Sequence, residues 1–314
     1  MIDINKAIES LDWSREPKGL YEPIEYTLSA GGKRVRPQLL MTACRMFGGE
    51  EEKALPAALA LEVFHNFTLL HDDVMDHAPV RRGRETVHIR WDENTAILSG
   101  DQMLIEAYKL IAKVPSDKVL STLRWFNEMA TEICEGQQLD VDFEAREDVR
   151  LEEYIEMIRL KTSVLLANAL RTGAYLAGAT DAQQQALYEH GIHLGLAFQI
   201  QDDLLDVYGD PKTFGKAIGG DICCNKKTYL LLTARDRANE AQRARMQELL
   251  GMPAGPDKIA RMTALYDELG VRLVAEEAIV AHTQAALRLL DGMPQNEATD
   301  GLRALANKLE NRKS

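Results

Sequence analysis

The sequence predicts an all-α fold, a single large helical bundle around a central cavity. Apolar residues recur at helical spacing in long stretches that fill most of the 314 residues. Strand-like alternation is nearly absent, and no Asn-Gly or Asp-Gly turn joins two alternating runs. No linker is long enough to divide the chain, so we expect one domain over residues 1–314.

The expected helices are assigned from the spacing of apolar residues. In the first, Leu55, Leu59, Val63 and Leu70 recur at the spacing of one helix face. The same test assigns helices to residues 54–77, 94–113, 117–139, 151–177, 181–207, 227–249 and 257–290. Glycine or proline marks the expected loops, at Gly31-Gly32, Gly48-Gly49, Pro79, Pro115, Pro211, Gly219-Gly220, Pro253 and Pro256.

Composition limits the partners that this chain is expected to have. A formal net charge of -12 disfavours nucleic acid and anionic membrane surfaces. No apolar run reaches the roughly 18 residues of a transmembrane segment, and Met1 to Lys6 lack an apolar signal core. The four cysteines show no Cys-x-x-Cys spacing, which favours reduced thiols and a cytoplasmic protein.

Two short acidic motifs stand out against this background. Residues 69–76 read LLHDDVMD and residues 199–206 read QIQDDLLD. The first and last aspartates of each motif are four residues apart, about 40° around a helix, and so share one face. The pattern Asp-Asp-x-x-Asp thus occurs twice, at Asp72, Asp73 and Asp76 and at Asp202, Asp203 and Asp206.

A metal site explains these motifs better than a solvated acidic face does. Both follow apolar turns, and carboxylates crowded together repel one another unless a cation lies between them. Carboxylate ligands favour a hard ion such as Mg²⁺ over zinc, and Mg²⁺ shares its coordination shell with phosphate oxygens. We therefore expect the two motifs to face each other and to bind a diphosphate through several magnesium ions.

Basic residues lie near both acidic motifs. Arginine suits bidentate phosphate contacts, and lysine supplies a point charge. Any one of these residues could be a solvated surface charge, but their grouping in an acidic chain favours an anion site. The groups are Lys33, Arg34 and Arg36; Arg81, Arg82 and Arg84; and Lys216, Lys226 and Lys227.

Some polar residues inside the expected helices have two interpretations. His65 lies seven residues before Asp72, near the same helix face, and could bind a ligand or stabilise the core. Lys161 and Thr162 interrupt an apolar helix, where a lysine commonly extends its ammonium group to solvent. Gln199 could equally be a hydrogen-bonding core residue.

The ordered set of motifs resembles the trans-isoprenyl diphosphate synthase (polyprenyl synthase) family, as a short-chain member. The resemblance implies the all-α isoprenoid synthase fold, a homodimer and Mg²⁺ as cofactor. It also implies head-to-tail (1'-4) condensation of isopentenyl diphosphate with allylic diphosphates to give a short-chain trans-prenyl diphosphate. The matching segments span most of the chain and read GGKRVRP, HNFTLLHDDVMD, RRGRETVH, EGQQLD, LKTSVL, FQIQDDLLD and FGKAIGGD.

The same resemblance implies roles for individual residues. Isopentenyl diphosphate would contact Lys33, Arg36, His65 and Arg82. The allylic diphosphate would contact Arg81, Lys161, Thr162, Gln199, Lys216 and Lys226. Magnesium would be held by Asp72, Asp76 and Asp202, supported by Asp73, Asp203 and Asp206, so that Asp72, Asp76, Asp202, Lys161 and Lys216 form the catalytic set. Glu85 replaces an expected proline, which leaves the shape of its loop open.

The resemblance also implies a mechanism without a nucleophilic side chain. The allylic C–O bond would break as the magnesium ions and cationic side chains stabilise the departing diphosphate. The double bond of isopentenyl diphosphate would then attack the allylic cation, and a proton would be lost to the departing diphosphate. An apolar bundle interior would exclude the water that quenches such a cation.

Product length is expected to depend on residues just upstream of Asp72. Thr68 is four residues before Asp72 and near its face, whereas Phe67 is rotated by about 140° on an ideal helix. The resemblance places bulky chain-length stops at these two positions. One aromatic beside a small residue suggests a short product of fifteen or twenty carbons. The first motif lacks the two-residue insertion of typical bacterial farnesyl diphosphate synthases, which slightly favours geranylgeranyl diphosphate over farnesyl diphosphate. Phe67 as an ordinary core residue is the alternative.

Other functions fit the motifs less well. A class I terpene cyclase would not need GGKRVRP together with His65. A non-catalytic regulatory subunit of a prenyl synthase would be expected to lose an aspartate motif, and both are intact. A di-iron bundle needs two Glu-x-x-His pairs, and the sequence provides one, at Glu62 and His65.

Overall fold

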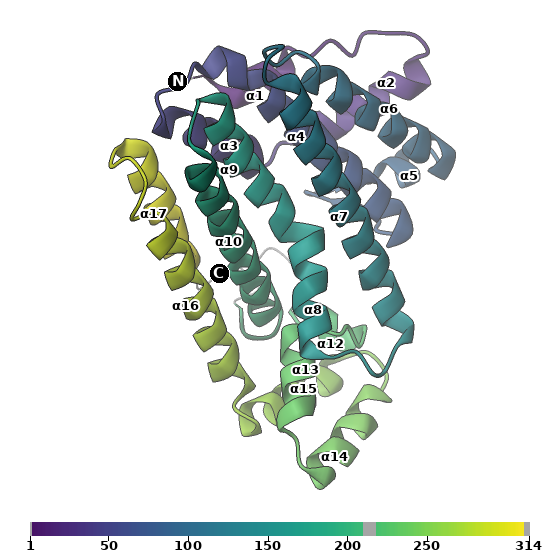
Figure 1. The fold of residues 1–314 in the computed structure, drawn as a ribbon. Coiled ribbons are helices and arrows are strands. Elements are labelled where there is room, and N and C mark those ends of the chain that lie inside the picture. Colours follow the sequence, from purple (N-terminus) through teal and green to yellow (C-terminus); the bar gives the residue numbers. More distant parts are fainter. Residues whose placement is uncertain (1, 210–217, 311–314) are drawn as a thin grey trace. The chain divides into compact units, whose positions relative to one another are not determined.

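The structure is a computed structural model that describes residues 2–209 and 218–310. These residues are almost entirely helical, which confirms the predicted all-α fold (Figure 1). The helices are α1 (Ile4–Glu9), α2 (Lys18–Ser29), α3 (Val35–Met46), α4 (Glu51–Met75), α5 (Val87–Arg90), α6 (Glu93–Ile111), α7 (Val119–Ala145), α8 (Leu151–Ile158), the π-helix η1 (Arg159–Ser163), α9 (Val164–Leu176), α10 (Asp181–Tyr208), α12 (Gly220–Cys223), α13 (Tyr229–Arg237), α14 (Glu240–Leu250), α15 (Pro256–Glu268), α16 (Val271–Leu289) and α17 (Glu297–Glu310).

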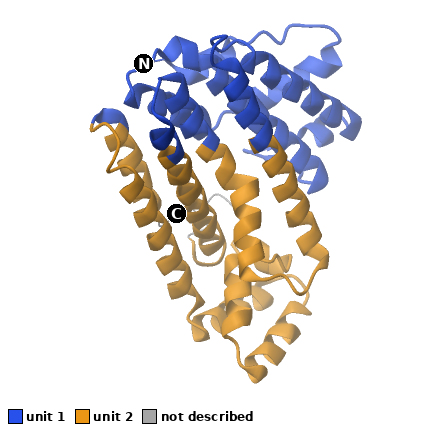
Figure 2. Cartoon of the chain, in the orientation of Figure 1, with its two compact units in different colours: residues 1–128, 168–185, 296–298 blue, residues 129–167, 186–295, 299–314 orange. Residues whose placement is uncertain are grey.

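The chain divides into two compact units (Figure 2). Unit 1 comprises residues 1–128, 168–185 and 296–298, and unit 2 comprises residues 129–167, 186–295 and 299–314. The first aspartate motif belongs to unit 1 and the second to unit 2.

Helix α4 is the central element of unit 1 and packs against α2, α3 and α6. Four of its alanines, Ala54, Ala57, Ala58 and Ala60, are fully buried, because small side chains let neighbouring helices approach closely. Glu51 and Glu52 occupy its first turn, where carboxylates stabilise the positive end of the helix dipole. This helix carries His65, Phe67 and the first aspartate motif at its C-terminal end.

A short hairpin follows α4, formed by β1 (Val80–Arg81) and β2 (Arg84–Glu85). The turn residues Arg82 and Gly83 have φ angles of 51° and 74°, as a two-residue turn with two left-handed positions requires. The lack of an Asn-Gly or Asp-Gly pair therefore does not exclude a tight hairpin here. Gly83 adopts the left-handed conformation easily, and Arg82 takes the position that Asn or Asp usually fills.

Two of the long helices expected in unit 2 are interrupted. Residues 227–249 form α13 and α14, because Asn239 begins a new helix by capping Gln242 N–H at 3.0 Å. Residues 257–290 form α15 and α16, separated at Gly270, whose φ of 66° ends the first helix. The structure also has α1, α2, α3 and α17, for which the periodicity predicted no helix.

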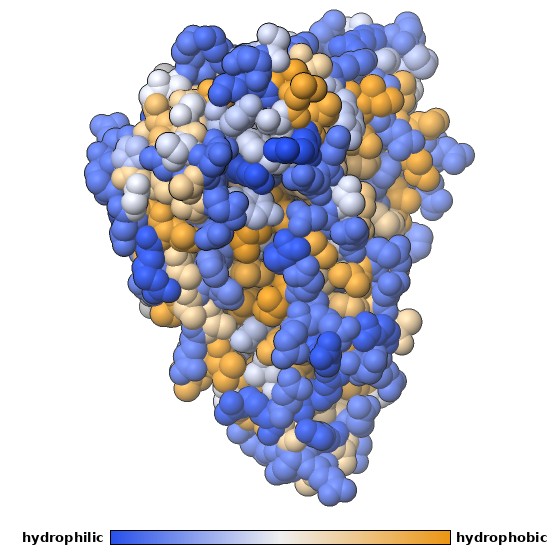
Figure 3. All heavy atoms as spheres, in the orientation of Figure 1, coloured by the Kyte–Doolittle hydropathy of each residue, from blue (hydrophilic) through white to orange (hydrophobic). Residues whose placement is uncertain are grey.

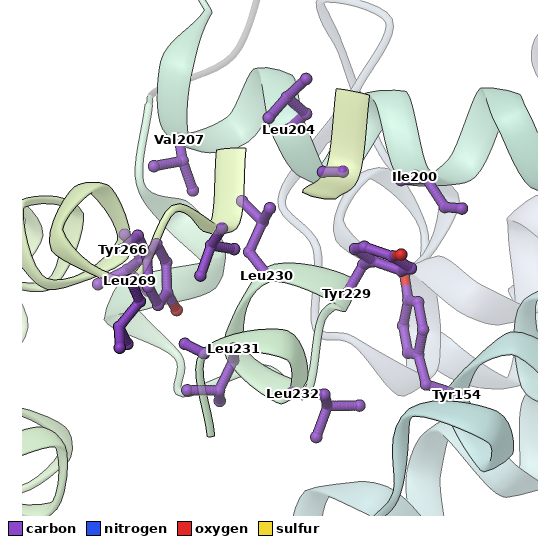
Figure 4. Packing of buried hydrophobic residues seen from close by; sticks show 14 of the residues in the cluster. Tyr154, Ile200, Leu204, Val207, Tyr229, Leu230, Leu231, Leu232, Tyr266 and Leu269 are labelled. Atoms are coloured by element: carbon purple, nitrogen blue, oxygen red, sulfur yellow. The ribbon is translucent and has the colours of Figure 1, made fainter. Parts of the chain in front are cut away.

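The core of unit 2 gathers side chains from α8, α10, α13, α15 and α16. Figure 4 shows Tyr154 of α8 beside Tyr229 of α13, with Ile200 and Leu204 of α10 close by. Tyr266 and Leu269 from the end of α15 close another side of the same cluster. The residues around the second aspartate motif thus belong to a packed core.

The surface is largely polar in the view of Figure 3, with apolar atoms exposed in places. Some of these apolar atoms lie at the upper right, where Figure 1 labels α6. Among the described residues, no helix combines the length and the apolar character needed to cross a membrane.

Candidate active site

The first aspartate motif lies on the last turn of α4. Asp72 is partly exposed, Asp73 is buried and Asp76 is exposed at the C-cap of the helix. The backbone N–H of Asp76 donates to the carbonyl of Asp72 at 2.8 Å, which keeps the two residues one helical turn apart. Asp72 and Asp76 therefore present carboxylates towards solvent from one helix face.

Asp73 turns inward and pairs with an arginine of the hairpin. Arg81 Nε donates to Asp73 Oδ1 at 2.7 Å. Burial raises the pKa of Asp73, although the positive charge of Arg81 acts to lower it. Both residues line one pocket of unit 1, together with Asn66, Leu69 and Arg82. The ion pair fixes the hairpin to the end of α4.

His65 lies among arginines in unit 1. Burial and the nearby positive charges lower its pKa well below 6.5, so the imidazole is neutral. Burial also lowers the pKa of Arg36, to about 10, which leaves it cationic at neutral pH. The charges that act on His65 belong to Arg36, Arg82, Arg81 and Arg34. Three residues predicted to contact isopentenyl diphosphate, Arg36, His65 and Arg82, thus come together.

The glycine pair before α3 receives the Arg82 guanidinium. Arg82 Nη1 donates to the carbonyl of Gly31. Gly32 has a φ of 135°, and a Cβ at this position would lie 3.1 Å from Arg82 Cζ. A side chain would therefore both strain this backbone and crowd the arginine. Lys33 follows with an exposed side chain.

Arg34 forms a buried ion pair inside unit 1. Its Nη1 donates to Glu62 Oε1 at 2.6 Å, and its Nη2 donates to the Leu28 carbonyl at 2.6 Å. Glu62 also accepts from the Asn66 side chain at 3.0 Å. Because its carboxylate is occupied in this way, Glu62 holds the α2–α3 connection and does not act with His65 as a metal-binding pair.

The second aspartate motif lies near the end of α10 and is mostly buried. Asp203 accepts hydrogen bonds from the Tyr154 hydroxyl and from the backbone N–H of Tyr229, the latter at 2.9 Å. Burial raises the pKa of Asp203 to about 7. Asp206 is also buried and accepts from the backbone N–H of Asp221 at 3.1 Å. Asp202 alone of the three keeps partial exposure.

Lys161 and Thr162 lie within the π-helix η1, which widens one turn between α8 and α9. Lys161 Nζ donates to Asp140 Oδ2 at 2.6 Å, and Thr162 Oγ1 donates to Gln199 Oε1 at 3.4 Å. A Cβ at Gly136 would lie 2.4 Å from the backbone nitrogen of Lys161, so glycine is required where α7 passes this turn. Wide turns of this kind occur often at functional sites.

Lys226 acts on the same carboxylate as Lys161. Burial would raise the pKa of Asp140, but the charges of Lys226 and Lys161 hold it below its ordinary value. These contacts link Lys161 with Lys226 through Asp140, and Thr162 with Gln199; all four residues are ones that the resemblance assigns to the allylic diphosphate. Lys216 lies outside the described residues.

Sequence reasoning missed Asp140 and Tyr154, the partners of two predicted site residues. Asp140 ends the EGQQLD motif, which gave a usable signal, but its role as the partner of Lys161 depends on packing between helices. Tyr154 lies 49 residues from Asp203, and nothing in the local sequence marks their contact.

The donor set fits magnesium but does not form a closed metal site. In residues 2–209 and 218–310, no group of three or more His, Cys, Asp or Glu side chains converges closely enough to hold a metal by itself. Magnesium usually keeps several waters and binds through one or two carboxylates together with substrate phosphates. The outward carboxylates of Asp72 and Asp76, and the partly exposed Asp202, suit that mode of binding.

Phe67 belongs to an aromatic row along α4. Its ring centroid lies 5.5 Å from that of Phe64 and 4.8 Å from that of His71. Phe64 in turn lies 5.2 Å from Phe126 of α7. Thr68 is partly buried, and its hydroxyl donates to the His65 carbonyl at 2.9 Å.

Known proteins of one family are similar to this chain over most of its length. Residues 17–269 match the polyprenyl synthetase family. A geranylgeranyl diphosphate synthase of Methanosarcina mazei is 42% identical over 74% of this chain and 73% of its own. A geranylfarnesyl diphosphate synthase of Natronomonas pharaonis is 37% identical over 98% and 94%. A crystal structure of geranylgeranyl pyrophosphate synthetase from Pyrococcus horikoshii matches with a TM-score of 0.93 at 34% identity, covering 98% and 95%.

Proposed function

Because this chain belongs to the polyprenyl synthetase family and is a trans-prenyltransferase, we propose that it condenses isopentenyl diphosphate with allylic diphosphates, head to tail. The observation that carries the proposal is that both units combine an aspartate motif with cationic side chains. In each unit an Asp-Asp-x-x-Asp motif with a partly exposed leading aspartate, Asp72 or Asp202, lies near a cationic side chain of another element. Arg81 pairs with Asp73, and the charge of Lys226 acts on Asp203.

In unit 1, isopentenyl diphosphate is bound by Arg36, Arg82 and the exposed Lys33, with His65 as a neutral hydrogen-bond donor. Two or three cations match the charge of a diphosphate. A neutral His65 donates a hydrogen bond without adding a further charge among the arginines. The Gly31-Gly32 pair supports this group by receiving the Arg82 guanidinium.

The allylic diphosphate is bound by Lys161, Lys226, Thr162 and Gln199 of unit 2, with Arg81 and Lys216. As the allylic C–O bond breaks, negative charge grows on the departing diphosphate, and fixed cations stabilise it without reorganising. The allylic cation is then attacked by the double bond of isopentenyl diphosphate, and a proton passes to the departing diphosphate. The aspartates bind and orient the reactants and form no covalent bond to them.

Asp72, Asp76 and Asp202 would hold magnesium together with the diphosphate. When bound, the ions neutralise the negative charge that develops on the leaving group. The other three aspartates support these residues through contacts within the protein. Asp73 pairs with Arg81, Asp203 accepts from Tyr154 and Tyr229, and Asp206 accepts from Asp221.

A short product is proposed, with geranylgeranyl diphosphate slightly favoured over farnesyl diphosphate. The partly buried Phe67 beside the small Thr68 supports a single bulky stop. The names of the relatives, which run from geranylgeranyl to geranylfarnesyl diphosphate synthase, agree with a short chain but leave the length to experiment.

A homodimer is proposed, with α6 at its interface. Ile97, Leu98, Ile105 and Tyr108 are exposed apolar residues of α6, and they lie within about 100° of its circumference. Such a stripe is usually covered in solution. Sedimentation velocity of the wild-type chain and of Ile105→Glu checks this, since the dimer should weaken in the variant. A wild-type chain that sediments as a monomer would contradict it.

Two further expectations remain proposals. We treat residues 1–314 as one polyprenyl synthase domain, supported by a family match over residues 17–269 that includes parts of both units. A cytoplasmic location is supported by four cysteines without disulfide-like spacing.

The decisive experiment is incubation of the purified chain with labelled isopentenyl diphosphate, each allylic primer and Mg²⁺, followed by sizing of the products. Elongated prenyl diphosphates are expected, and chelation of Mg²⁺ should abolish them. Cyclised hydrocarbons formed without isopentenyl diphosphate would indicate a terpene cyclase instead. Activity that appears only with a second protein would indicate a regulatory subunit.

A further inference from the structure

Lys258 of α15 is a fully buried lysine whose hydrogen bonds, within residues 2–209 and 218–310, go to neutral oxygens. Its side chain is 2% exposed. Its Nζ donates to Asn225 Oδ1 at 2.7 Å, to the Leu250 carbonyl at 3.2 Å and to the Met252 carbonyl at 3.3 Å. Three acceptors satisfy the three donors of an ammonium group. Lysine is almost never buried so completely without an ion pair, so this arrangement indicates a specific role.

The shortest of these contacts fixes an unusual backbone conformation. Asn225 has a φ of 55°, in the left-handed region that few residues other than glycine adopt. Its Nδ2 donates to the Leu250 carbonyl at 3.1 Å while its Oδ1 accepts from Lys258. Both ends of the amide are therefore held, and the side chain cannot turn without breaking two hydrogen bonds.

The fixed turn leads directly into Lys226. The backbone N–H of Lys226 donates to the Asp221 carbonyl at 2.9 Å. The positive charge of Lys226 acts on Asp140, the carboxylate that also accepts from Lys161, and on Asp203. A small pocket of unit 2 is lined by Asn225, Lys226, Asp203 and Asp221 among others. The conformation at Asn225 therefore sets where the Lys226 side chain begins.

We propose that Lys258 is a positioning residue for the allylic diphosphate, which acts by holding the left-handed turn at Asn225 so that Lys226 reaches the substrate. This inference rests on the proposed role of Lys226. The competing explanation is purely structural, since the Leu250 and Met252 carbonyls lie at the C-terminal end of α14, where a cation stabilises the helix. The two explanations differ in what they predict for substrate binding.

The test compares Lys258→Met with Lys226→Ala and with the double variant, by steady-state kinetics on the full chain. Each single variant should raise KM for the allylic diphosphate about tenfold, the size expected for one lost charge-assisted contact, and leave KM for isopentenyl diphosphate unchanged. The double variant should be no worse than either single one, because both changes remove the same contact. Arg261→Met, an exposed change on the same helix, is the matched control.

A second pair of variants keeps the proposal open to test if Lys258→Met does not fold. Asn225→Ala should raise the same KM, because it loses the acceptor and disfavours the turn, whereas Asn225→Asp should keep it near wild type. A wild-type KM in Asn225→Ala, or additive effects in the double variant, would overturn the positioning role. If Lys226→Ala itself leaves KM unchanged, the proposed contact of Lys226 fails, and the inference fails with it.

Discussion

The two aspartate motifs have the same spacing but lie in different surroundings. In unit 1 the middle aspartate, Asp73, pairs with a cation, Arg81. In unit 2 its counterpart, Asp203, accepts from a neutral hydroxyl and a backbone N–H. The last residue differs too, because α4 ends before Asp76 whereas α10 continues beyond Asp206.

This difference assigns different tasks to one sequence pattern. The first motif presents two carboxylates, Asp72 and Asp76, to solvent, whereas the second presents Asp202 and uses the other two to hold the fold. The two motifs therefore differ in how many of their aspartates reach solvent, two in the first and one in the second. The following predictions test this contrast, beginning with the largest expected effect.

Loss of the leading aspartate should be severe in both motifs. Asp72→Ala and Asp202→Ala should each lower kcat about a thousandfold or more, because metal binding contributes several kcal/mol to stabilising the transition state. Circular dichroism should show an intact helical fold. Asp181→Ala, at the exposed start of α10, serves as the control. Turnover close to wild type in either variant would remove that aspartate from the metal site.

Protonation of the buried His190 of unit 2 should destabilise the folded protein at acid pH. Burial lowers the pKa of His190 to about 4, although its hydrogen bond to the Ala286 carbonyl acts to raise it. Because the pKa of His190 is lower in the folded than in the unfolded protein, the stability that neutral His190 contributes is full above pH 6.5. It is lost as the pH falls towards 4. Between pH 7 and pH 5, His190 should cost about 2 kcal/mol of the free energy of unfolding.

Urea unfolding at pH 7 and pH 5 measures this effect. His190→Asn keeps a donor for the Ala286 carbonyl but cannot take up the proton, so its stability should fall less between the two pH values. His77→Gln, an exposed change, should behave as wild type. Equal losses in wild type and His190→Asn would show that His190 is not responsible.

The partners of the middle aspartates should differ in their contribution to stability. Tyr154→Phe leaves a buried carboxyl without one donor and should lower the free energy of unfolding by about 1–3 kcal/mol. Asp73→Asn weakens an ion pair whose arginine is 36% exposed, and should cost less than about 1 kcal/mol. Urea unfolding compares the two variants. A larger loss of unfolding free energy in Asp73→Asn than in Tyr154→Phe would contradict this contrast between the units.

The smallest effect concerns product length and not rate. Phe67→Ala should lengthen the product by one or more isoprene units if Phe67 forms the floor of the tail site. Phe126→Leu, a change farther along the same aromatic row, is the control for lost ring packing and should leave the product unchanged. Chromatographic sizing measures the products. An unaltered product in Phe67→Ala would show that Phe67 is an ordinary core residue.

Long, uniformly periodic helices were predictable from the sequence. Residues 54–77 correspond to α4 (Glu51–Met75), and residues 181–207 correspond to α10 (Asp181–Tyr208). The breaks at Ala238 and Gly270 were not predicted, since apolar spacing continues on both sides and a single residue ends each helix. Short helices such as α1 contain too few turns to show a period.

The sequence motifs single out the candidate site residues, but they do not show the partners of these residues. Periodicity places Asp202 and Asp203 around the axis of α10, yet it carries no information on which neighbouring helix each one meets. The contact of Asp203 with Tyr154 and the contact of Lys161 with Asp140 both join distant parts of the chain. Such contacts follow from packing, which local sequence does not encode.

The π-helix η1 lets the chain carry one more residue in 159–163 without turning the helices on either side. A π turn accommodates about one residue more than an α turn. Removing one residue here would restore a regular α turn and would leave α8 and α9 in nearly the same rotational register, because the π turn alone absorbs the extra residue. The contacts of Tyr154 with Asp203 and of Ala167 with Gly191 should therefore survive such a deletion, whereas Lys161, inside the turn, would lose its position opposite Asp140.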